Sequence, residues 1–444
     1  MSQSSTFKSH LKANLHISIP IIVGQLGQIA TSVADNVMIG NAGSEQIAAA
    51  SLANGIFFFF FVIGIGFSMS LTPLVAEAFT QKKLLKTLSF FKNSLVAHTV
   101  LGLVLILAVL CISLILDKLG QNPEIVELSA PYLQLQALSI LPVLLFLSYK
   151  QFLEGLADTK AAMTITIIAN LINIGLNAVL IYGYFGFPAY GLFGAGIATL
   201  ASRILMFVAI FVYFQWTSRY QELRVWFAKA KINRTILNKL KALGWPIGLQ
   251  FAFEVSAFGG ASILAGWIDE ASLAAHQVAL NLASTTWSIA TGFGAAVTVR
   301  IAQAQAKRQS ESILPIAYSG YVLSLAWMTF SGIIFFYFGY PLADLYLDDP
   351  EIVMLASQLI FVAVLFQISD GAQVVGLGAL RGLKDVNRPT WISFFSYWIV
   401  GIPIAYALAF HYEWGVEGVW YGLFAGLTTS AVLLFVRLRR FKSL

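Results

Sequence analysis

The sequence predicts an all-α polytopic membrane protein, in which twelve transmembrane helices form two six-helix bundles related by a pseudo-two-fold axis along the membrane normal. Three observations support this fold class: an apolar composition, basic residues gathered on alternate loops, and a repeat that relates the two halves of the chain. With 58% hydrophobic and 11% charged residues, the 444-residue chain has too little polar surface to cover a water-soluble body of this size.

The helices are predicted from apolar runs, since about 20 helical residues cross the hydrocarbon core of a bilayer. The first run follows a stretch with Lys8 and Lys12, is long, and lacks a small-residue cleavage signature. We therefore expect it to be a retained span and not a cleaved signal peptide. The predicted spans are 17–39, 49–75, 93–116, 128–149, 162–184, 190–215, 245–267, 275–299, 316–340, 353–378, 390–410 and 416–436.

The loops between these spans differ in charge on the two sides of the membrane, and Lys and Arg accumulate on the cytoplasmic side. We therefore expect both termini to be cytoplasmic and the protein to lie in the plasma (inner) membrane. Because the basic residues are spread over several loops, we expect no nucleic-acid partner. One side carries Lys8, Lys12, Lys82, Lys83, Lys86, Lys92, Arg219, Arg224, Lys229, Lys231, Arg234, Lys239, Lys241, Arg437, Arg439, Arg440 and Lys442, and the other carries Lys118 with the acids Asp117, Glu124, Glu127, Asp269, Glu270, Asp344, Asp348, Asp349 and Glu351.

An internal repeat divides the chain into two halves. When the second half of the chain is aligned with the first at a constant offset, Pro20 matches Pro246 and Gly66 matches Gly292. With that offset increased by one position, Asp158 matches Asp385. Six spans return the chain to its starting side, so the repeats are parallel, an arrangement that suits rocking of two lobes about a central cavity. The predicted organisation is an amino-terminal lobe at 1–216, a basic cytoplasmic linker at 217–242 and a carboxy-terminal lobe at 243–444.

Two carboxylates fall inside the carboxy-terminal spans, and such groups are functional candidates because charge in hydrocarbon is costly. Glu254 lies roughly 13 Å and Asp370 roughly 12 Å from the cytoplasmic side, so their depths are compatible with one site. Gln250 precedes Glu254 by one turn, and Gln367 and Gln373 flank Asp370. Such a group can bind Na⁺ or share a proton. Alternatively, both acids are protonated and hydrogen-bonded to helix backbones or hydroxyls.

The amino-terminal half holds a third intramembrane acid, Asp35, near the external end of the first span. Gln25, Gln28 and Ser32 share its helix face, and Gln28 aligns with Glu254 in the repeat. The two lobes therefore carry acids at non-equivalent positions, which predicts distinct duties, although Asp35 can also be a solvated interfacial carboxylate. Other polar stripes, which line a cavity or hold helices together, are Asn170, Asn173 and Asn177 on the fifth span and Gln277, Asn281 and Ser284 on the eighth.

The sequence lacks the motifs that are typical of several other functional classes. It contains no Walker A sequence, no HExxH and no Ser-His-Asp pattern, and its single cysteine, Cys111, lies in an apolar run. We expect neither an enzyme nor an ATP-driven pump, and no cofactor. Arg203, deep in the sixth span, either neutralises an acid or extends toward the interface.

Three segments resemble the multidrug and toxic-compound extrusion (MATE) family, and its NorM branch in particular: VADNVMIGNAG at 33–43, QFAFE at 250–254 and FQISDGAQVVGLGALRGLKD at 366–385. The resemblance covers nearly the whole chain. It implies exchange of an organic cation for Na⁺ or H⁺, with Glu254 and Asp370 as the cation-binding (Na⁺) acids and Asp35 as the amino-terminal acid. Phe366 departs from the pattern, because it offers a π face where a tyrosine would supply an oxygen.

We therefore predict a secondary active multidrug efflux transporter that exports cationic amphipathic molecules by antiport with Na⁺ or H⁺ through alternating access, as a monomer. A lipid-linked oligosaccharide flippase has a similar architecture, but its polyanionic cargo would call for several basic cavity residues. An ion channel is the third alternative. Intramembrane acids outnumber intramembrane arginines, and the half-repeats carry their acids asymmetrically, which favours antiport of a cation.

Overall fold

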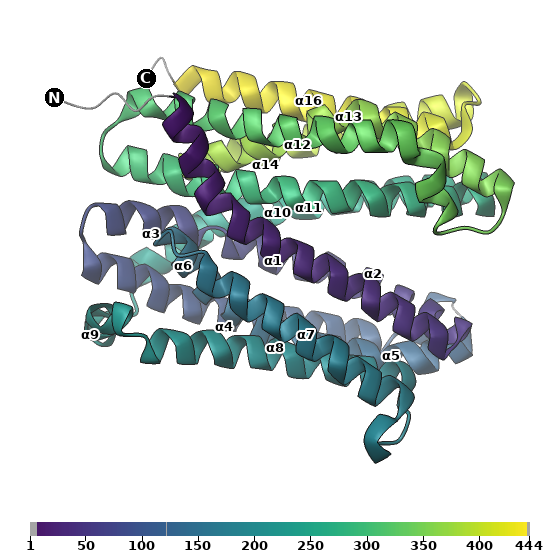
Figure 1. Cartoon of the computed structure of the whole chain (residues 1–444), viewed down its shortest axis with the longest axis horizontal. Coiled ribbons are helices and arrows are strands. Elements are labelled where there is room, and N and C mark those ends of the chain that lie inside the picture. Colours follow the sequence, from purple (N-terminus) through teal and green to yellow (C-terminus); the bar gives the residue numbers. More distant parts are fainter. Residues whose placement is uncertain (1–6, 121, 442–444) are drawn as a thin grey trace. The chain divides into compact units, whose positions relative to one another are not determined.

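The computed structural model describes residues 7–120 and 122–441, and helices make up most of this chain (Figure 1). The predicted basic residue Lys442 lies outside the described residues. The helices of the first half are α1 (Phe7–Ala42), α2 (Ser44–Ser68), α3 (Leu71–Thr80), α4 (Leu84–Ser113), η1 (Leu116–Leu119), α5 (Pro123–Leu138), α6 (Ile140–Gly155), α7 (Lys160–Tyr182), η2 (Tyr184–Gly186) and α8 (Gly191–Trp216).

The second half of the chain begins with a short linker helix and continues with long helices. Its elements are η3 (Ser218–Tyr220), α9 (Gln221–Lys229), α10 (Arg234–Ile268), α11 (Glu270–Ala306), α12 (Ser310–Asp344), α13 (Pro350–Gly382), α14 (Asn387–Phe394), η4 (Phe395–Gly401), α15 (Ile402–Tyr406), η5 (Ala407–His411) and α16 (Gly415–Arg440). The elements η4 and η5 are π-helical, so one predicted span contains two segments of wider turn.

The predicted spans coincide with these helices, and several of them are longer than predicted. Within the described residues, eleven helical stretches are long and apolar enough to cross a membrane. The remaining predicted span, 275–299, lies in α11, which has 37 residues but a more polar sequence. Several α11 hydroxyls donate to carbonyls of their own helix, which satisfies them without water. These include the hydroxyls of Thr285, Ser288 and Thr291.

The backbone confirms the internal repeat. In the described chain, six residues other than glycine have positive φ, a conformation that is uncommon for side-chain-bearing residues. They form three pairs at corresponding places in the two halves: Lys82 with Arg308, Ala157 with Lys384, and Phe185 with Glu413. The offset within a pair grows by a single position from each pair to the next. The same turns are therefore built twice from different side chains.

Close helix contacts are repeated as well. Thr72 donates to the carbonyl of Gln151 at 3.2 Å, and the equivalent Thr298 donates to the carbonyl of Gly378 at 2.8 Å. A methyl group on Gly66 would lie 2.7 Å from the Cα of Gly248. A methyl group on the equivalent Gly292 would lie 2.5 Å from Ile22. Glycine is required at both positions because the helices approach too closely for a side chain.

The chain divides into two compact units, and both boundaries fall inside helices. One unit comprises Met1–Ile22 with Leu249–Leu444, and the other comprises Val23–Gly248. These limits differ from the predicted 1–216 and 243–444, because the first part of α1 belongs with the carboxy-terminal helices and the first part of α10 with the amino-terminal helices. Val23 and Leu249, where the two boundaries fall, are equivalent positions of the repeat. The first parts of α1 and α10 are therefore assigned to the other unit at the same point of each half.

Specific polar contacts hold the first part of α1 in the carboxy-terminal unit. Arg300 donates to the carbonyl of His10 at 2.8 Å and to Asn14 Oδ1 at 3.0 Å. Asn14 donates in turn to Ser319 Oγ at 2.8 Å. In this unit, the beginning of α1 and the end of α16 lie at the same end (Figure 1), as expected for an even number of spans.

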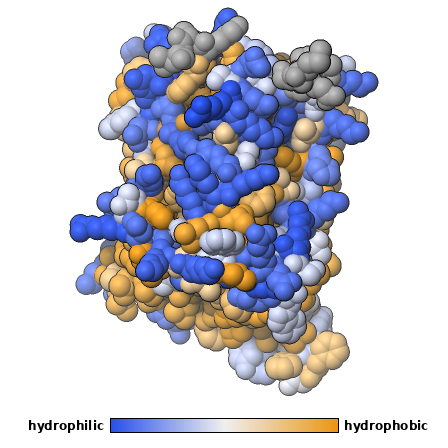
Figure 2. Space-filling model, turned by 90° about the vertical axis from the view of Figure 1, so that its left-hand side faces the viewer, coloured by the Kyte–Doolittle hydropathy of each residue, from blue (hydrophilic) through white to orange (hydrophobic). Residues whose placement is uncertain are grey.

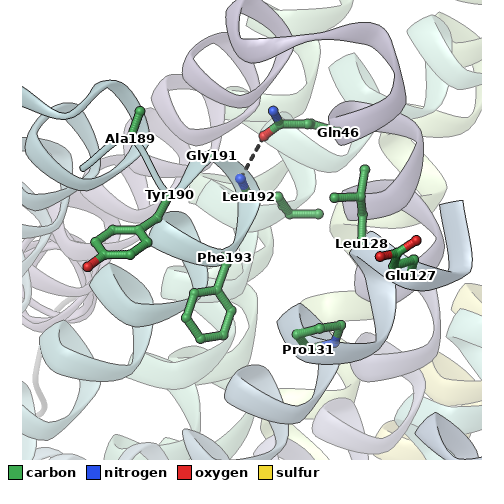
Figure 3. A pocket seen from close by; sticks show the side chains of 9 residues that line it. All are labelled: Gln46, Glu127, Leu128, Pro131, Ala189, Tyr190, Gly191, Leu192 and Phe193. Atoms are coloured by element: carbon green, nitrogen blue, oxygen red, sulfur yellow. Dashed lines mark hydrogen bonds between the residues drawn. The ribbon is translucent and has the colours of Figure 1, made fainter. Parts of the chain in front are cut away.

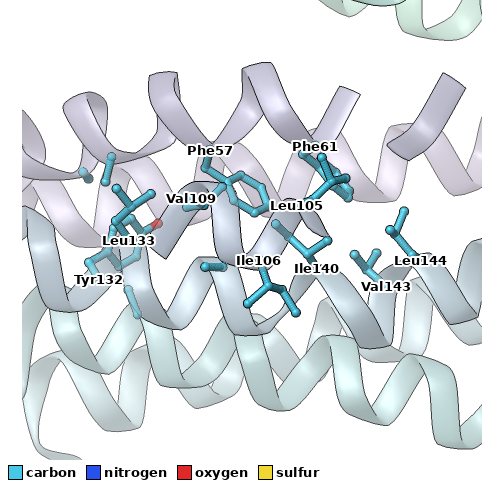
Figure 4. Packing of buried hydrophobic residues seen from close by; sticks show 14 of the residues in the cluster. Phe57, Phe61, Leu105, Ile106, Val109, Tyr132, Leu133, Ile140, Val143 and Leu144 are labelled. Carbon is cyan, nitrogen blue, oxygen red and sulfur yellow. The ribbon is translucent and has the colours of Figure 1, made fainter. Parts of the chain in front are cut away.

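Each unit has its own apolar core. In the amino-terminal unit, Phe57 and Phe61 of α2 stack with 5.1 Å between ring centroids and pack against buried leucine, isoleucine and valine side chains of α4, α5 and α6 (Figure 4). In the carboxy-terminal unit, α13 contacts α11, α12 and α16. Helix α13 crosses α11 most closely at Gly378, where an added Cβ would lie 2.3 Å from the carbonyl oxygen of Gly294.

We predict that Gly378→Ala destabilises the protein by about 1–3 kcal/mol, since the methyl group would force α13 away from α11. The measurement is the thermal unfolding midpoint of the purified protein in detergent. Gly332→Ala is the control, because its added Cβ would lie 3.6 Å from Val364, an ordinary contact distance. Equal midpoints for the two variants would show that this crossing tolerates a larger residue.

Candidate functional site

The structure brings Glu254 and Asp370 into one polar cluster of the carboxy-terminal unit. Glu254 lies on α10 and Asp370 on α13, and both side chains are buried. Glu254 is an acidic neighbour of Asp370. Gln373, one turn after Asp370, donates to Glu254 Oε1 at 3.4 Å and so connects the two helices. Burial in an apolar bundle makes each negative charge costly unless a cation compensates it.

Two members of this cluster were not identified from the sequence. The Tyr397 hydroxyl donates to Gln373 Oε1 at 2.9 Å, and its ring is 1% exposed. Tyr397 lies in the π-helical segment η4, and segments of this kind often occur at functional sites. The second is Arg381, the basic neighbour of Glu254, whose guanidinium lies 5.8 Å from the Phe251 ring centroid. The repeat offered a signal for Tyr397, because the offset that aligns Asp158 with Asp385 also aligns Tyr397 with the predicted stripe residue Asn170.

The remaining predicted residues of this unit take different positions. Gln367 pairs with Thr286 at 3.0 Å, which joins α13 to α11. Gln250 is buried next to Glu254, one turn earlier on α10. Phe366 is 2% exposed and stacks on Trp420 at 5.4 Å, so in this structure it packs the core. Gln277 and Asn281 are exposed on α11.

The charges of this cluster suit one monovalent cation. Two carboxylates and the Arg381 guanidinium together carry one formal negative charge, which a single proton or Na⁺ neutralises. The carboxylates, Gln373 and the Tyr397 hydroxyl supply oxygen atoms, the ligand type that Na⁺ prefers. In the described part of the chain, His, Cys, Asp and Glu form no group of three or more that could hold a metal ion. The cluster therefore offers oxygen atoms and one uncompensated formal negative charge.

In the amino-terminal unit, Asp35 pairs with the predicted stripe on α7. The Asn177 side-chain nitrogen donates to Asp35 and, at 3.3 Å, to Asn173 Oδ1. Asn170 lies one turn earlier, 3.3 Å from the position of a Cβ on Gly27. These contacts join α1 to α7 beyond Val23, the part of α1 that belongs to this unit. On α1, the predicted neighbours of Asp35 differ in exposure: Gln25 is half-buried, whereas Gln28 and Ser32 are exposed.

Arg203 makes interhelical contacts within the amino-terminal unit. Its Nη1 donates to Gln136 Oε1 at 3.1 Å and to the Ser139 hydroxyl. The guanidinium also lies over the Phe57 ring, 4.9 Å from its centroid. Asp35 is its acidic neighbour. This unit therefore holds a carboxylate and a guanidinium that balance each other, unlike the net negative cluster of the other unit.

A separate pocket lies near the loop that precedes α8 and is unconnected to these acids. It has a volume of about 380 Å³, and Gln46 closes one side by accepting a hydrogen bond from the Leu192 backbone at 2.6 Å (Figure 3). Glu127 is its acidic residue, and its other lining side chains include Tyr190 and Phe193. It lacks the paired carboxylates that make the α10 and α13 cluster the better candidate for ion binding.

The model of the MatE family matches this sequence twice, at residues 20–179 and 246–407. This chain belongs to the MatE family. The two matches begin at Pro20 and Pro246, which are equivalent in the repeat, so the family pattern coincides with the repeat seen in the backbone. The chain is thus a multi-pass membrane protein.

Relatives of this MatE protein match over almost the full chain. It is 33% identical to a probable multidrug resistance protein NorM of Agrobacterium fabrum, over 98% of this chain and 95% of the relative. It is 31% identical to the multidrug resistance protein NorM of Aliivibrio fischeri, over 96% and 93%. Neither protein is named as an enzyme.

Solved structures share the fold at lower identity. One is an outward-facing multidrug resistance MATE family transporter, with a TM-score of 0.89, 20% identity and coverage of 98% of this chain and 96% of that chain. Another is a transporter from Pyrococcus furiosus, with a TM-score of 0.90, 19% identity and the same coverage. At this identity the likeness concerns the fold alone.

We predict that Arg203→Met lowers the stability of the MatE protein by about 1–3 kcal/mol, since it leaves buried Gln136 and Ser139 without their donor. Thermal unfolding in detergent measures the loss. Arg234→Met is the matched control, because Arg234 is exposed at the start of α10. A loss no larger than that of the control would mean that the guanidinium does not hold the helices together.

Proposed function

We propose that this protein is a multidrug efflux transporter that exports organic cations by antiport with Na⁺ or H⁺ through alternating access. The observation that carries the proposal is the buried Glu254 and Asp370 pair, which together with Arg381 carries a single formal negative charge. Support also comes from the relatives, which are named multidrug resistance proteins. The proposal includes a location in the plasma (inner) membrane, cytoplasmic termini and a monomeric state.

A cationic cargo is favoured by the charges along the spans. The acids Asp35, Glu254 and Asp370 lie on helices that otherwise carry few charges. Cationic molecules can exchange for protons or Na⁺ at such sites because each compensates the same buried charge. A polyanionic cargo would need an excess of basic groups there, and Arg203 is already engaged by Gln136 and Ser139.

Antiport follows if the coupling ion and the drug favour opposite states of the protein. Ion binding at Glu254 and Asp370 then weakens drug binding, and thermodynamic linkage requires the drug to weaken ion binding equally. The buried polar bonds from Gln373 and Tyr397 position the carboxylates for this exchange. Asp35, in the other unit, acts on drug affinity or release.

We predict that Glu254→Gln and Asp370→Asn each abolish gradient-driven efflux and abolish the weakening of drug binding by the coupling ion. Folding should persist, because neutral amides are cheaper to bury than unpaired carboxylates. Asp35→Asn should alter drug affinity while retaining the ion effect. Equilibrium drug binding with and without the ion measures these outcomes.

Glu154→Gln is the matched control for these variants. Glu154 is a buried carboxylate of α6, 3.9 Å from Lys150, and lies in the amino-terminal unit. It should retain efflux and ion antagonism. If antagonism persists in both Glu254→Gln and Asp370→Asn, the coupling site lies elsewhere, with Asp35 as the next candidate.

The coupling ion is tested by separate gradients. In proteoliposomes loaded with ethidium, an imposed Na⁺ gradient or an imposed pH gradient should drive efflux, and the effective ion is the one whose effect disappears in Asp370→Asn. Protein-free vesicles correct for leakage. Equal efflux without either gradient would contradict antiport and favour a channel.

A further inference from the structure

A basic pocket lies at the turn between α3 and α4. It is lined by Lys82, Lys83, Leu84, Leu85, Lys86 and Trp226, and its volume is about 490 Å³. Among the described residues, those that line it comprise three lysines and no acid. The three lysines are exposed, and Leu85 is 46% exposed, so cationic and apolar groups are both accessible in one small area.

The two walls of the pocket come from distant parts of the sequence and are held together by hydrogen bonds. Lys92 of α4 donates to the carbonyls of Ala230 at 2.8 Å and Phe227 at 3.4 Å, which satisfies the end of α9. Asn93 donates to the Lys231 carbonyl at 3.0 Å. Because α9 is fixed to α4 in this way, Trp226 is held beside the lysines.

The pocket lies where one candidate membrane span ends and the next begins. Lys82 and Lys83 lie between two candidate membrane spans, Ser44–Thr80 and Leu84–Ser113, and Lys86 lies in the first turn of the second span. Hydrophilic side chains gather on the face that carries α9 (Figure 2). Tryptophan is enriched at the membrane interface, where lysines bind lipid phosphate groups. Lys229, 5.0 Å from the Trp226 ring centroid, adds a further positive charge.

The repeat provides an internal comparison. The equivalent turn between α11 and α12 has the same positive φ, at Arg308 in place of Lys82. Its sequence differs, since Lys83, Leu84, Leu85 and Lys86 correspond to Gln309, Ser310, Glu311 and Ser312. The turn geometry therefore does not require lysines or leucines, and the chemistry of the first turn needs another explanation.

We propose that this pocket binds the headgroup of an anionic phospholipid, with the lysines on the phosphate and with Leu85 and Trp226 against the glycerol and upper acyl region. A phospholipid joins an anionic phosphodiester to an apolar region. The pocket likewise places lysines beside the apolar side chains of Leu85 and Trp226. The site is independent of the Glu254 and Asp370 cluster, so it can be tested without assuming transport.

Native mass spectrometry of the full chain in detergent, titrated with phosphatidylglycerol or phosphatidylcholine of identical acyl chains, tests the proposal. Phosphatidylglycerol should bind more tightly, and Lys83→Gln with Lys86→Gln should weaken it about thirtyfold. Lys307→Gln with Arg308→Gln removes the same charge from the equivalent turn and should change the affinity little.

A loop exchange guards against misfolding. The variant Lys83→Gln, Leu84→Ser, Leu85→Glu and Lys86→Ser carries the sequence that already forms the second turn, and it should fold but lose the lipid preference. Equal loss in the Lys307 and Arg308 control, or no loss in the pocket variants, would overturn the proposal. Complete competition by glycerol 3-phosphate or inorganic phosphate would assign the pocket to a soluble phosphate and not to lipid.

Discussion

The cost of burying charge is the constraint on which this structure depends. Hydrocarbon around a helix bundle gives a carboxylate no water, so each intramembrane acid must find donors or a compensating cation. Asp35 meets this requirement with Asn177 and with Arg203 as its basic neighbour. Glu254 and Asp370 have one arginine neighbour between them. The second cluster therefore retains one formal negative charge, which supports the proposed binding of a cation there.

The repeat supplies one scaffold on which the two halves carry different chemistry. Backbone turns, glycine crossings and threonine bonds recur at a nearly constant offset along the chain. The polar residues of the two candidate clusters do not recur: Gln28 corresponds to Glu254, and Asn170 to Tyr397. Packing constrains the first group, because helix crossings tolerate little change in volume. Exposed or cluster positions are freer to differ, and so the two units can hold separate sites.

The sequence predicted the helices well because membrane spans need long apolar runs, and charge in the loops gave an independent check. The pairing of Glu254 with Asp370 followed from equal depth. Tyr397 and Arg381 were missed for physical reasons: η4 has π-helical geometry, which no apolar periodicity reveals, and Arg381 lies in the last turn of α13 beyond the predicted span. Phe366 was predicted to line the site because it lies one helical turn before Asp370, but its ring stacks on Trp420. Helical spacing alone does not distinguish these two positions.

The unit boundaries were missed because they lie inside continuous helices, where no linker composition marks them. Pro20 and Pro246 each lie just before a boundary, at equivalent positions of the repeat. A proline inside a helix lacks the amide that would bond to the preceding turn, so the backbone ladder is interrupted at the same repeat position in both helices. Beyond the interruptions lie Asp35 on α1 and Glu254 on α10. Each of these acids is thus carried by a helix whose first part belongs to the other unit.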